Sequence, residues 1–324
     1  MATAREVTVP AAPAVATTPA HQVLAFAVLL VALVAAPFLV YPVFVMKALC
    51  FALFACAFNL LIGYVGLLSF GHAAFLGGAG YAAAHAAKVW AVRPEIAILF
   101  GTAVAALLGV VFGALAIRRL GIYFAMITLA LAQMLFFFCL QAPFTGGEDG
   151  IQAVPRGVLL GVLDLRDMYT IYFVVLAIFL LGFLLIYRTI HSPFGQVLKA
   201  IRENEARAVS LGYRAEQYKL LAFVLSATLS GVAGATKAIV FQLASLTDVH
   251  WSMSGEVVLM TLLGGLGTIF GPVVGAFVVV SLENYLAQLG AWVTVVEGAI
   301  FVVCVLTFRR GIVGELGRLL RKPL

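Results

Sequence analysis

The chain has 324 residues, of which 64% are hydrophobic and 10% charged, and its mean hydropathy is +1.13. Repeated apolar runs of about 20 residues are typical of helical proteins that cross the bilayer several times, so we expect an all-α polytopic transmembrane bundle. Alternating segments of about ten residues are lacking, which argues against an outer-membrane barrel. The net charge of +6 does not indicate nucleic-acid binding, because the basic residues are confined to loops and the C-terminal tail.

The chain begins with a segment, 1–22, that is rich in Ala, Pro and Thr and is predicted to be a disordered cytoplasmic lead-in. An apolar transmembrane domain, 23–308, is predicted to follow, and a basic cytoplasmic tail, 309–324, ends the chain. We predict eight to ten spans, the ten-span reading placing them near 23–40, 43–61, 64–86, 95–117, 120–141, 169–187, 219–242, 254–270, 273–289 and 292–308.

The distribution of basic residues predicts the orientation. Placing both termini in the cytoplasm puts 14 of the 20 Lys and Arg residues on that side. Loops rich in Lys and Arg stay cytoplasmic, which supports this arrangement. The segment 188–219 is then a cytoplasmic loop, and 142–168 is the longest periplasmic loop.

The third and eighth spans are dense in glycine, over 63–84 and 259–276. They take the second place in two four-span blocks, 43–141 and 219–308, and cross in opposite directions. Gly-interrupted segments in matching places of inverted halves point to a substrate pathway. The candidate pathway residues are Asn59, Ser69, Gly71, His72, Gly264, Gly265 and Gly267.

Close helix packing is the alternative explanation for these residues. Gly267, Gly271 and Gly275 form a double GxxxG, which lets helices approach closely, and buried Asn and Ser side chains commonly bond neighbouring helices. His72 and His85 lack a third ligand at metal spacing, so we expect no metal site and no cofactor.

The outer loop 142–168 is longer than a simple connector needs. Its TGGEDG stretch combines turn-forming glycines with acidic side chains. Thr145, Gly146, Gly147, Asp149 and Gly150 are therefore candidates for an outer gate or docking site.

The segment 188–219 holds nine of the 34 charged residues of the chain. Ser192 is a predicted N-cap, with Pro193 at the first helical position. Phe194, Leu198 and Ile201 follow the spacing of one apolar helix face. Gly212 suits the position just past the helix end. We predict one short amphipathic helix that docks a soluble partner.

Several strings occur here in one order: NLLIGYVGLLSFGHAAFLGGAGYAAA, TGGEDG, SPFGQVLKAIRENEARAVSLG, VVLMTLLGGLGTIFGPVVGA and FRRGIVGEL. Together they resemble the M-type permease subunit of branched-chain amino acid (Leu/Ile/Val) ABC uptake transporters, over about residues 43–316. The wider family also includes importers of urea, amides and aromatic acids, so the resemblance leaves the solute open.

The resemblance implies that 188–219 is the coupling loop for an ATPase. The residues assigned to coupling are Pro193, Phe194, Gly195, Ala200, Ile201, Arg202, Glu203, Glu205, Ala206 and Gly212. Glu205, Ala206 and Gly212 match the family's loop motif. Arg207 departs from it, because a second Ala is usual at that place.

The implied partners are a second, similar permease, two cytoplasmic ATPases and a periplasmic binding protein that delivers a small-molecule solute. The resemblance also implies that the chain spans the lipid of the bacterial inner membrane. The chain itself has no GxxxxGK[ST] pattern, so hydrolysis falls to the partners and the chain is not an enzyme. A secondary transporter is the rival class. It needs buried acidic residues for ion coupling, whereas Glu256, Glu283 and Glu297, like Lys237, map near the outer surface.

Overall fold

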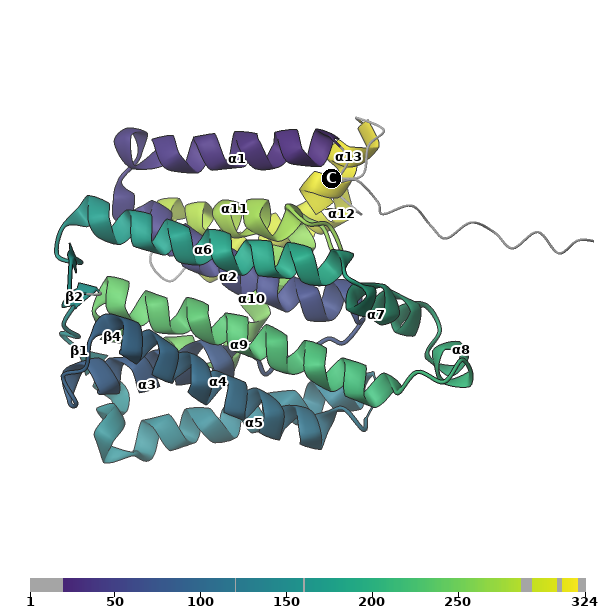
Figure 1. Cartoon of the computed structure of the whole chain (residues 1–324), viewed down its shortest axis with the longest axis horizontal. Coiled ribbons are helices and arrows are strands. Elements are labelled where there is room, and N and C mark those ends of the chain that lie inside the picture. The colour runs from purple at the N-terminus through teal and green to yellow at the C-terminus, as the bar shows by residue number, and fades with distance from the viewer. Residues whose placement is uncertain (1–19, 120, 160, 287–292, 308–310, 320–324) are drawn as a thin grey trace, which may run out of the picture.

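A computed structural model describes residues 20–119, 121–159, 161–286, 293–307 and 311–319 (Figure 1). The lead-in predicted to be disordered lies almost entirely outside the described residues. The helices are α1 (Ala20–Leu39), α2 (Pro42–Tyr64), α3 (His72–Lys88), α4 (Pro94–Ala116), α5 (Ile122–Gln141), α6 (Met168–His191), α7 (Pro193–Glu203), α8 (Glu205–Ser210), α9 (Ala215–Phe241), α10 (Trp251–Gly264), α11 (Gly271–Leu286), α12 (Val293–Thr307) and α13 (Gly311–Leu319).

The described part of the chain has little other regular structure. It contains four two-residue strands, β1 (Ile151–Gln152), β2 (Val158–Leu159), β3 (Leu163–Asp164) and β4 (Leu243–Ala244), and three short 3₁₀ turns, η1 (Pro143–Thr145), η2 (Gly147–Asp149) and η3 (Leu246–Asp248). Strands β1 and β4 pair antiparallel, as do β2 and β3. The predicted all-α fold class is confirmed.

Each of the ten predicted spans contains one helix. Five of the described helices, α2, α4, α5, α6 and α9, are long and apolar enough to cross a bilayer. Helices α3, α10, α11 and α12 have 17, 14, 16 and 15 residues, which is shorter than the roughly 20 that a full crossing needs. The number of crossings therefore stays a prediction.

Helix α2 forms the centre of the bundle. It is apolar on all sides and nearly all of its side chains are buried against α6, α9, α10 and α11. An all-round apolar surface is what a helix needs at such a position. A second packing unit joins α3, α4 and α9 through small residues. A Cβ on Gly234 would lie 1.9 Å from the carbonyl oxygen of Leu76, so these backbones touch directly.

The two ends of the bundle carry different segments (Figure 1). Helices α7, α8 and α13 lie at one end, and strands β1, β2 and β4 lie at the other. The loop 142–168 and the charged segment 188–219 are thus on opposite sides, as their predicted topology requires. The predicted tail 309–324 is largely the helix α13, which packs against α10 and α11.

The third and eighth predicted spans are both interrupted. Helix α3 begins only at His72, after an irregular stretch at 65–71, and α10 ends at Gly264, before another at 265–270. Gly66, Gly265 and Gly267 have φ values of +82°, +125° and +74°, which only glycine adopts without strain. Both irregular stretches lie toward the α7 end of the bundle.

Candidate translocation and coupling site

Helix α7 begins where the sequence predicts. The Ser192 hydroxyl accepts a hydrogen bond from the backbone N–H of Gly195 at 3.3 Å, and Pro193 occupies the first helical position. The predicted N-cap is confirmed. Leu198 and Ile201 are buried, so the apolar face of α7 packs on the bundle rather than facing outward.

The prediction of a single helix up to Gly212 is wrong. Asn204 adopts an extended conformation (φ −158°, ψ 97°), and its side chain accepts a hydrogen bond from the backbone N–H of Arg207. It therefore ends α7 and caps the separate helix α8. Gly212 follows α8 with φ +89° and open space around it.

The residues assigned to coupling differ in burial, and Phe194 and Glu205 are half-buried. Gly195 and Ile201 are buried. A Cβ on Gly195 would lie 2.3 Å from the carbonyl oxygen of Ile190, so α7 is pressed against the end of α6. The exposed members offer a surface to a partner: Pro193, Ala200, Arg202, Glu203, Ala206 and Gly212.

Glu205 forms an ion pair within the chain. Its carboxylate lies 2.6 Å from the ammonium group of Lys219 at the start of α9. The Lys219 side chain is only 4% exposed, so without this partner its buried charge would be uncompensated. The pair fixes α8 on α9.

Arg202 connects α7 to both glycine-rich interruptions. Its guanidinium donates a hydrogen bond to the carbonyl oxygen of Gly63, near the end of α2. A Cβ on Gly66 would lie 3.1 Å from the Arg202 Cγ, and one on Gly267 would lie 3.5 Å from Nη1. Helix α7 thus contacts the stretches 65–71 and 265–270 through Arg202.

Asn59 of α2 holds the second of these stretches, 265–270, from inside the bundle. Its side-chain amide donates to the carbonyl of Thr268 at 2.9 Å and accepts from the backbone N–H of Gly267 at 3.0 Å. A Cβ on Gly264 would lie 1.9 Å from the carbonyl oxygen of Gly271. Asn59 and Arg202 therefore both meet Gly267, Gly265 begins the same stretch, and close backbone contact accounts for Gly264.

The other pathway candidates lie at the start of α3. His72 is fully buried, its Nε2 is 2.9 Å from the Ser226 hydroxyl, and the Phe58 and Phe75 rings flank it edge-on. Ser69 Oγ accepts from the backbone N–H of Gly71 at 3.1 Å. These contacts support helix packing as the role of this group.

A Cβ on Gly71 would lie 3.0 Å from the carbonyl oxygen of Thr128. The start of α3 is thus pressed against α5 at this point, and the pathway candidates divide into two separate groups.

The outer-loop candidates form a compact turn. The buried Thr145 hydroxyl lies 2.6 Å from the carbonyl oxygens of Cys139 and Ala142. Gly146, Gly147 and Gly150 have positive φ, and Asp149 is exposed. A Cβ on Gly150 would lie 2.2 Å from the Ala244 carbonyl oxygen, so the turn rests on β4.

Two ion pairs that the sequence analysis did not recognise lie near that end of the bundle. Lys237 of α9 pairs with Asp248 of η3, and Lys47 of α2 pairs with Glu283 of α11 at 2.9 Å. Both ammonium groups lie over the ring of Phe51, at 5.1 and 5.8 Å from its centroid. Charged residues in or beside apolar spans were the only signal available: Lys47 and Glu283 are 236 positions apart, and Lys237 and Asp248, although only 11 apart, lie on different elements.

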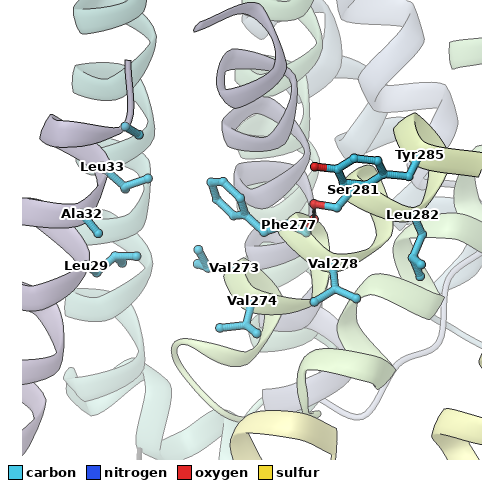
Figure 2. A pocket seen from close by; sticks show the side chains of 11 residues that line it. Leu29, Ala32, Leu33, Val273, Val274, Phe277, Val278, Ser281, Leu282 and Tyr285 are labelled. Carbon is cyan, nitrogen blue, oxygen red and sulfur yellow. Dashed lines mark hydrogen bonds between the residues drawn. The ribbon is translucent and has the colours of Figure 1, made fainter. Parts of the chain in front are cut away.

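An apolar groove separates α1 from α11 (Figure 2). It measures about 550 Å³ and is lined by Leu29 and Leu33 on one side and by Val274, Phe277 and Tyr285 on the other. None of its lining residues belongs to the coupling, pathway or outer-loop candidates.

Residues 42–305 match the family described as the permease component of branched-chain amino acid transport systems. The high-affinity branched-chain amino acid transport system permease protein LivM of Escherichia coli K12 is 25% identical over 93% of this chain and 77% of its own length.

Two sugar permeases are similar over less of the chain. The xylose transport system permease protein XylH of Escherichia coli K12 is 28% identical over 51% of this chain and 44% of its own length. The ribose import permease protein RbsC of Bacillus subtilis 168 is 29% identical over 56% of this chain and 58% of its own length. No solved structure matches significantly.

The family match covers most of the chain and includes both glycine-rich interruptions and α7. The resemblance stated from the sequence motifs is confirmed. The chain belongs to the family of ABC-type permease components of branched-chain amino acid transport systems, multi-pass membrane proteins that work with ATPase and binding-protein components.

Proposed function

We propose that this chain is a translocating subunit of an ATP-driven importer of branched-chain amino acids. The observation that carries the proposal is the extent of the similarity. The likeness to LivM covers 93% of the chain, while the likeness to the xylose and ribose permeases covers 51% and 56%. The importer pairs this chain with a second, similar permease and two ATPases, in the bacterial inner membrane.

The α7–α8 end is proposed to face the cytoplasm, together with both termini. The exposed polar side of α7 then meets an ATPase groove, a helix-in-groove arrangement, while its apolar side stays on the bundle. Arg202 and the Glu205–Lys219 pair bind this unit to α2 and α9. Movement of the ATPases is thereby transmitted as a rigid displacement of α7.

The coupling motion has a natural target in the two interruptions. Irregular backbone at membrane depth is tolerated where it is buried in protein or lines a water-filled cavity. Arg202 contacts both 65–71 and 265–270 at the α7 end, and Asn59 holds 265–270 on α2. We propose that this contact region opens and closes the inner side of the pathway.

The opposite end is proposed to receive the binding protein. The exposed acidic turn at Glu148 and Asp149 projects from the bundle, and its backbone is held by β1–β4 pairing. A docking partner would therefore act on the segment between α9 and α10 through a rigid contact.

Sugar import is the second candidate, because the xylose and ribose permeases also match. The deciding experiment purifies the complete complex with its own binding protein in proteoliposomes and compares the ATP hydrolysis stimulated by L-leucine, D-xylose and D-ribose. We expect L-leucine alone to stimulate hydrolysis and accumulate inside. Stimulation by a pentose without any by leucine contradicts the proposed function.

A further inference from the structure

The two ion pairs near Phe51 differ in depth. The side chains of Lys47 and Glu283 are 35% and 22% exposed, whereas those of Lys237 and Asp248 are 15% and 12% exposed. Charges so close to an apolar bundle core are costly and are functional candidates by default. Lys237 and Asp248 are too buried to be explained by side chains that reach out to water, so this deeper pair is the better candidate for a function.

A third polar group lies beside the deeper pair. Tyr81 of α3 is 5% exposed, and α3 packs directly against η3: a Cβ on Gly77, one turn before Tyr81, would lie 2.8 Å from the carbonyl carbon of Asp248. Its hydroxyl has no hydrogen-bond partner within the described residues. A buried hydroxyl without a partner is unfavourable, which makes this group available to a ligand.

The position of Asp248 depends on the outer loop. Asp248 lies in the segment 242–250 that links α9 to α10, and this segment pairs with the outer loop at Ile151↔Ala244. Gly150 adds a close backbone contact with Ala244. A partner that displaces the TGGEDG turn therefore moves Asp248 relative to Lys237, which is fixed on α9.

We propose that Lys237 and Asp248 form an outer solute site for a zwitterionic amino acid, a step that rests on the proposed function. When the pair opens, Lys237 receives the α-carboxylate and Asp248 the α-ammonium group. The Tyr81 hydroxyl supplies a further hydrogen bond, and the Phe51 ring offers an apolar surface to an aliphatic side chain.

The charge balance explains the selectivity of such a site. A zwitterion inserted between Lys237 and Asp248 gives each buried charge a new partner, so neither is left uncompensated. A sugar or another neutral solute would separate the pair without replacing either charge. Breaking a buried pair in this way leaves two uncompensated charges, so solutes without charged groups are rejected.

The test uses the complete complex in proteoliposomes with L-leucine as the probe. The first variant, Lys237→Gln/Asp248→Asn, removes both charges. The second, Lys237→Asp/Asp248→Lys, keeps an ion pair but reverses its direction, which preserves a purely structural role. The control, Lys47→Gln/Glu283→Gln, removes the neighbouring pair over the same ring.

We expect both Lys237/Asp248 variants to assemble with the ATPases and to lose leucine uptake by about tenfold or more, while the control stays within about twofold of the unmodified complex. Wild-type uptake by the reversed pair, or an equal loss in the control, overturns the inference. If the unmodified complex takes up a pentose and no leucine, the proposed function and this site fall together. Leucine uptake that survives both variants removes the site alone.

Discussion

The guanidinium of Arg202 on α7 donates a hydrogen bond to the backbone carbonyl of Gly63 in α2. Helix α2 is the most deeply buried span, and α7 is the helix that we propose docks on the ATPase. One side chain therefore links the surface that receives the mechanical input to the centre of the bundle.

We expect Arg202→Gln to assemble with the ATPases but to lose most of the hydrolysis stimulated by solute-loaded binding protein. The physical reason is loss of a charge-assisted hydrogen bond, worth about 1.5–3 kcal/mol, at the contact with Gly63. Arg207→Gln is the matched control, because Arg207 is exposed on α8. The measurement is ATP hydrolysis with solute-loaded binding protein relative to hydrolysis without it. Equal stimulation in the two variants and the unmodified complex would argue against Arg202 as the link.

Asn59→Leu is expected to destabilise the protein by about 2–4 kcal/mol. The replacement is similar in size but leaves the Thr268 carbonyl and the Gly267 N–H without their partner. Thermal unfolding of the purified variant measures the loss. Asn59→Gln, which keeps the amide on a longer stem, serves as the comparison. An unchanged melting temperature in Asn59→Leu would show that the stretch 265–270 is held by other contacts.

Two glycines on α10 should respond oppositely to alanine. Gly264→Ala places a methyl group 1.9 Å from the Gly271 carbonyl oxygen and is expected to cost about 1–3 kcal/mol. Gly255→Ala meets open space and should be neutral or stabilise by about 0.5–1 kcal/mol, because alanine favours the helix. Melting temperatures of the two variants provide the test. Normal stability with blocked uptake in Gly264→Ala would instead favour a pathway role.

Local sequence signals predicted the elements well where the chemistry is local. Ser192 and Pro193 marked the start of α7 because a cap and a fixed φ act within one turn. The break at Asn204 was missed, since Asn is only mildly unfavourable inside a helix and the apolar pattern gives no sign of it.

The candidate site was predictable only in part, because its contacts join distant segments. Glycine density located 65–71 and 265–270, yet Arg202 and Gly63 are 139 positions apart and Lys47 and Glu283 are 236 apart. A single sequence carries periodicity and local propensity, and neither specifies which side chains meet across a bundle.

The Glu205–Lys219 pair should show strong coupling in a double-mutant cycle. Glu205→Gln leaves the buried Lys219 ammonium unpaired and is expected to lower stability by about 1–3 kcal/mol, the partial exposure of Glu205 limiting the loss. Lys219→Met removes the charge that needs a partner, so adding it to Glu205→Gln should recover part of the loss. Simple additivity of the two single changes, measured by thermal unfolding, would contradict an energetically significant pair.

The proposed orientation is tested by single cysteines at the two ends of the bundle. Glu148 and Glu203 are both exposed, on the outer turn and on α7. Cys50, Cys56 and Cys139 are buried, and all four native cysteines are first replaced by alanine. Glu148→Cys should react with an impermeant thiol reagent added to intact cells, whereas Glu203→Cys should react only after permeabilisation. The same pair of reactions in the assembled complex should show protection of position 203 by the ATPase, because that side chain lies on the proposed docking surface. Labelling of both positions from outside would overturn the span count between them. Labelling in the reverse order would place α7 on the side opposite the cytoplasmic ATPases and contradict its role in coupling.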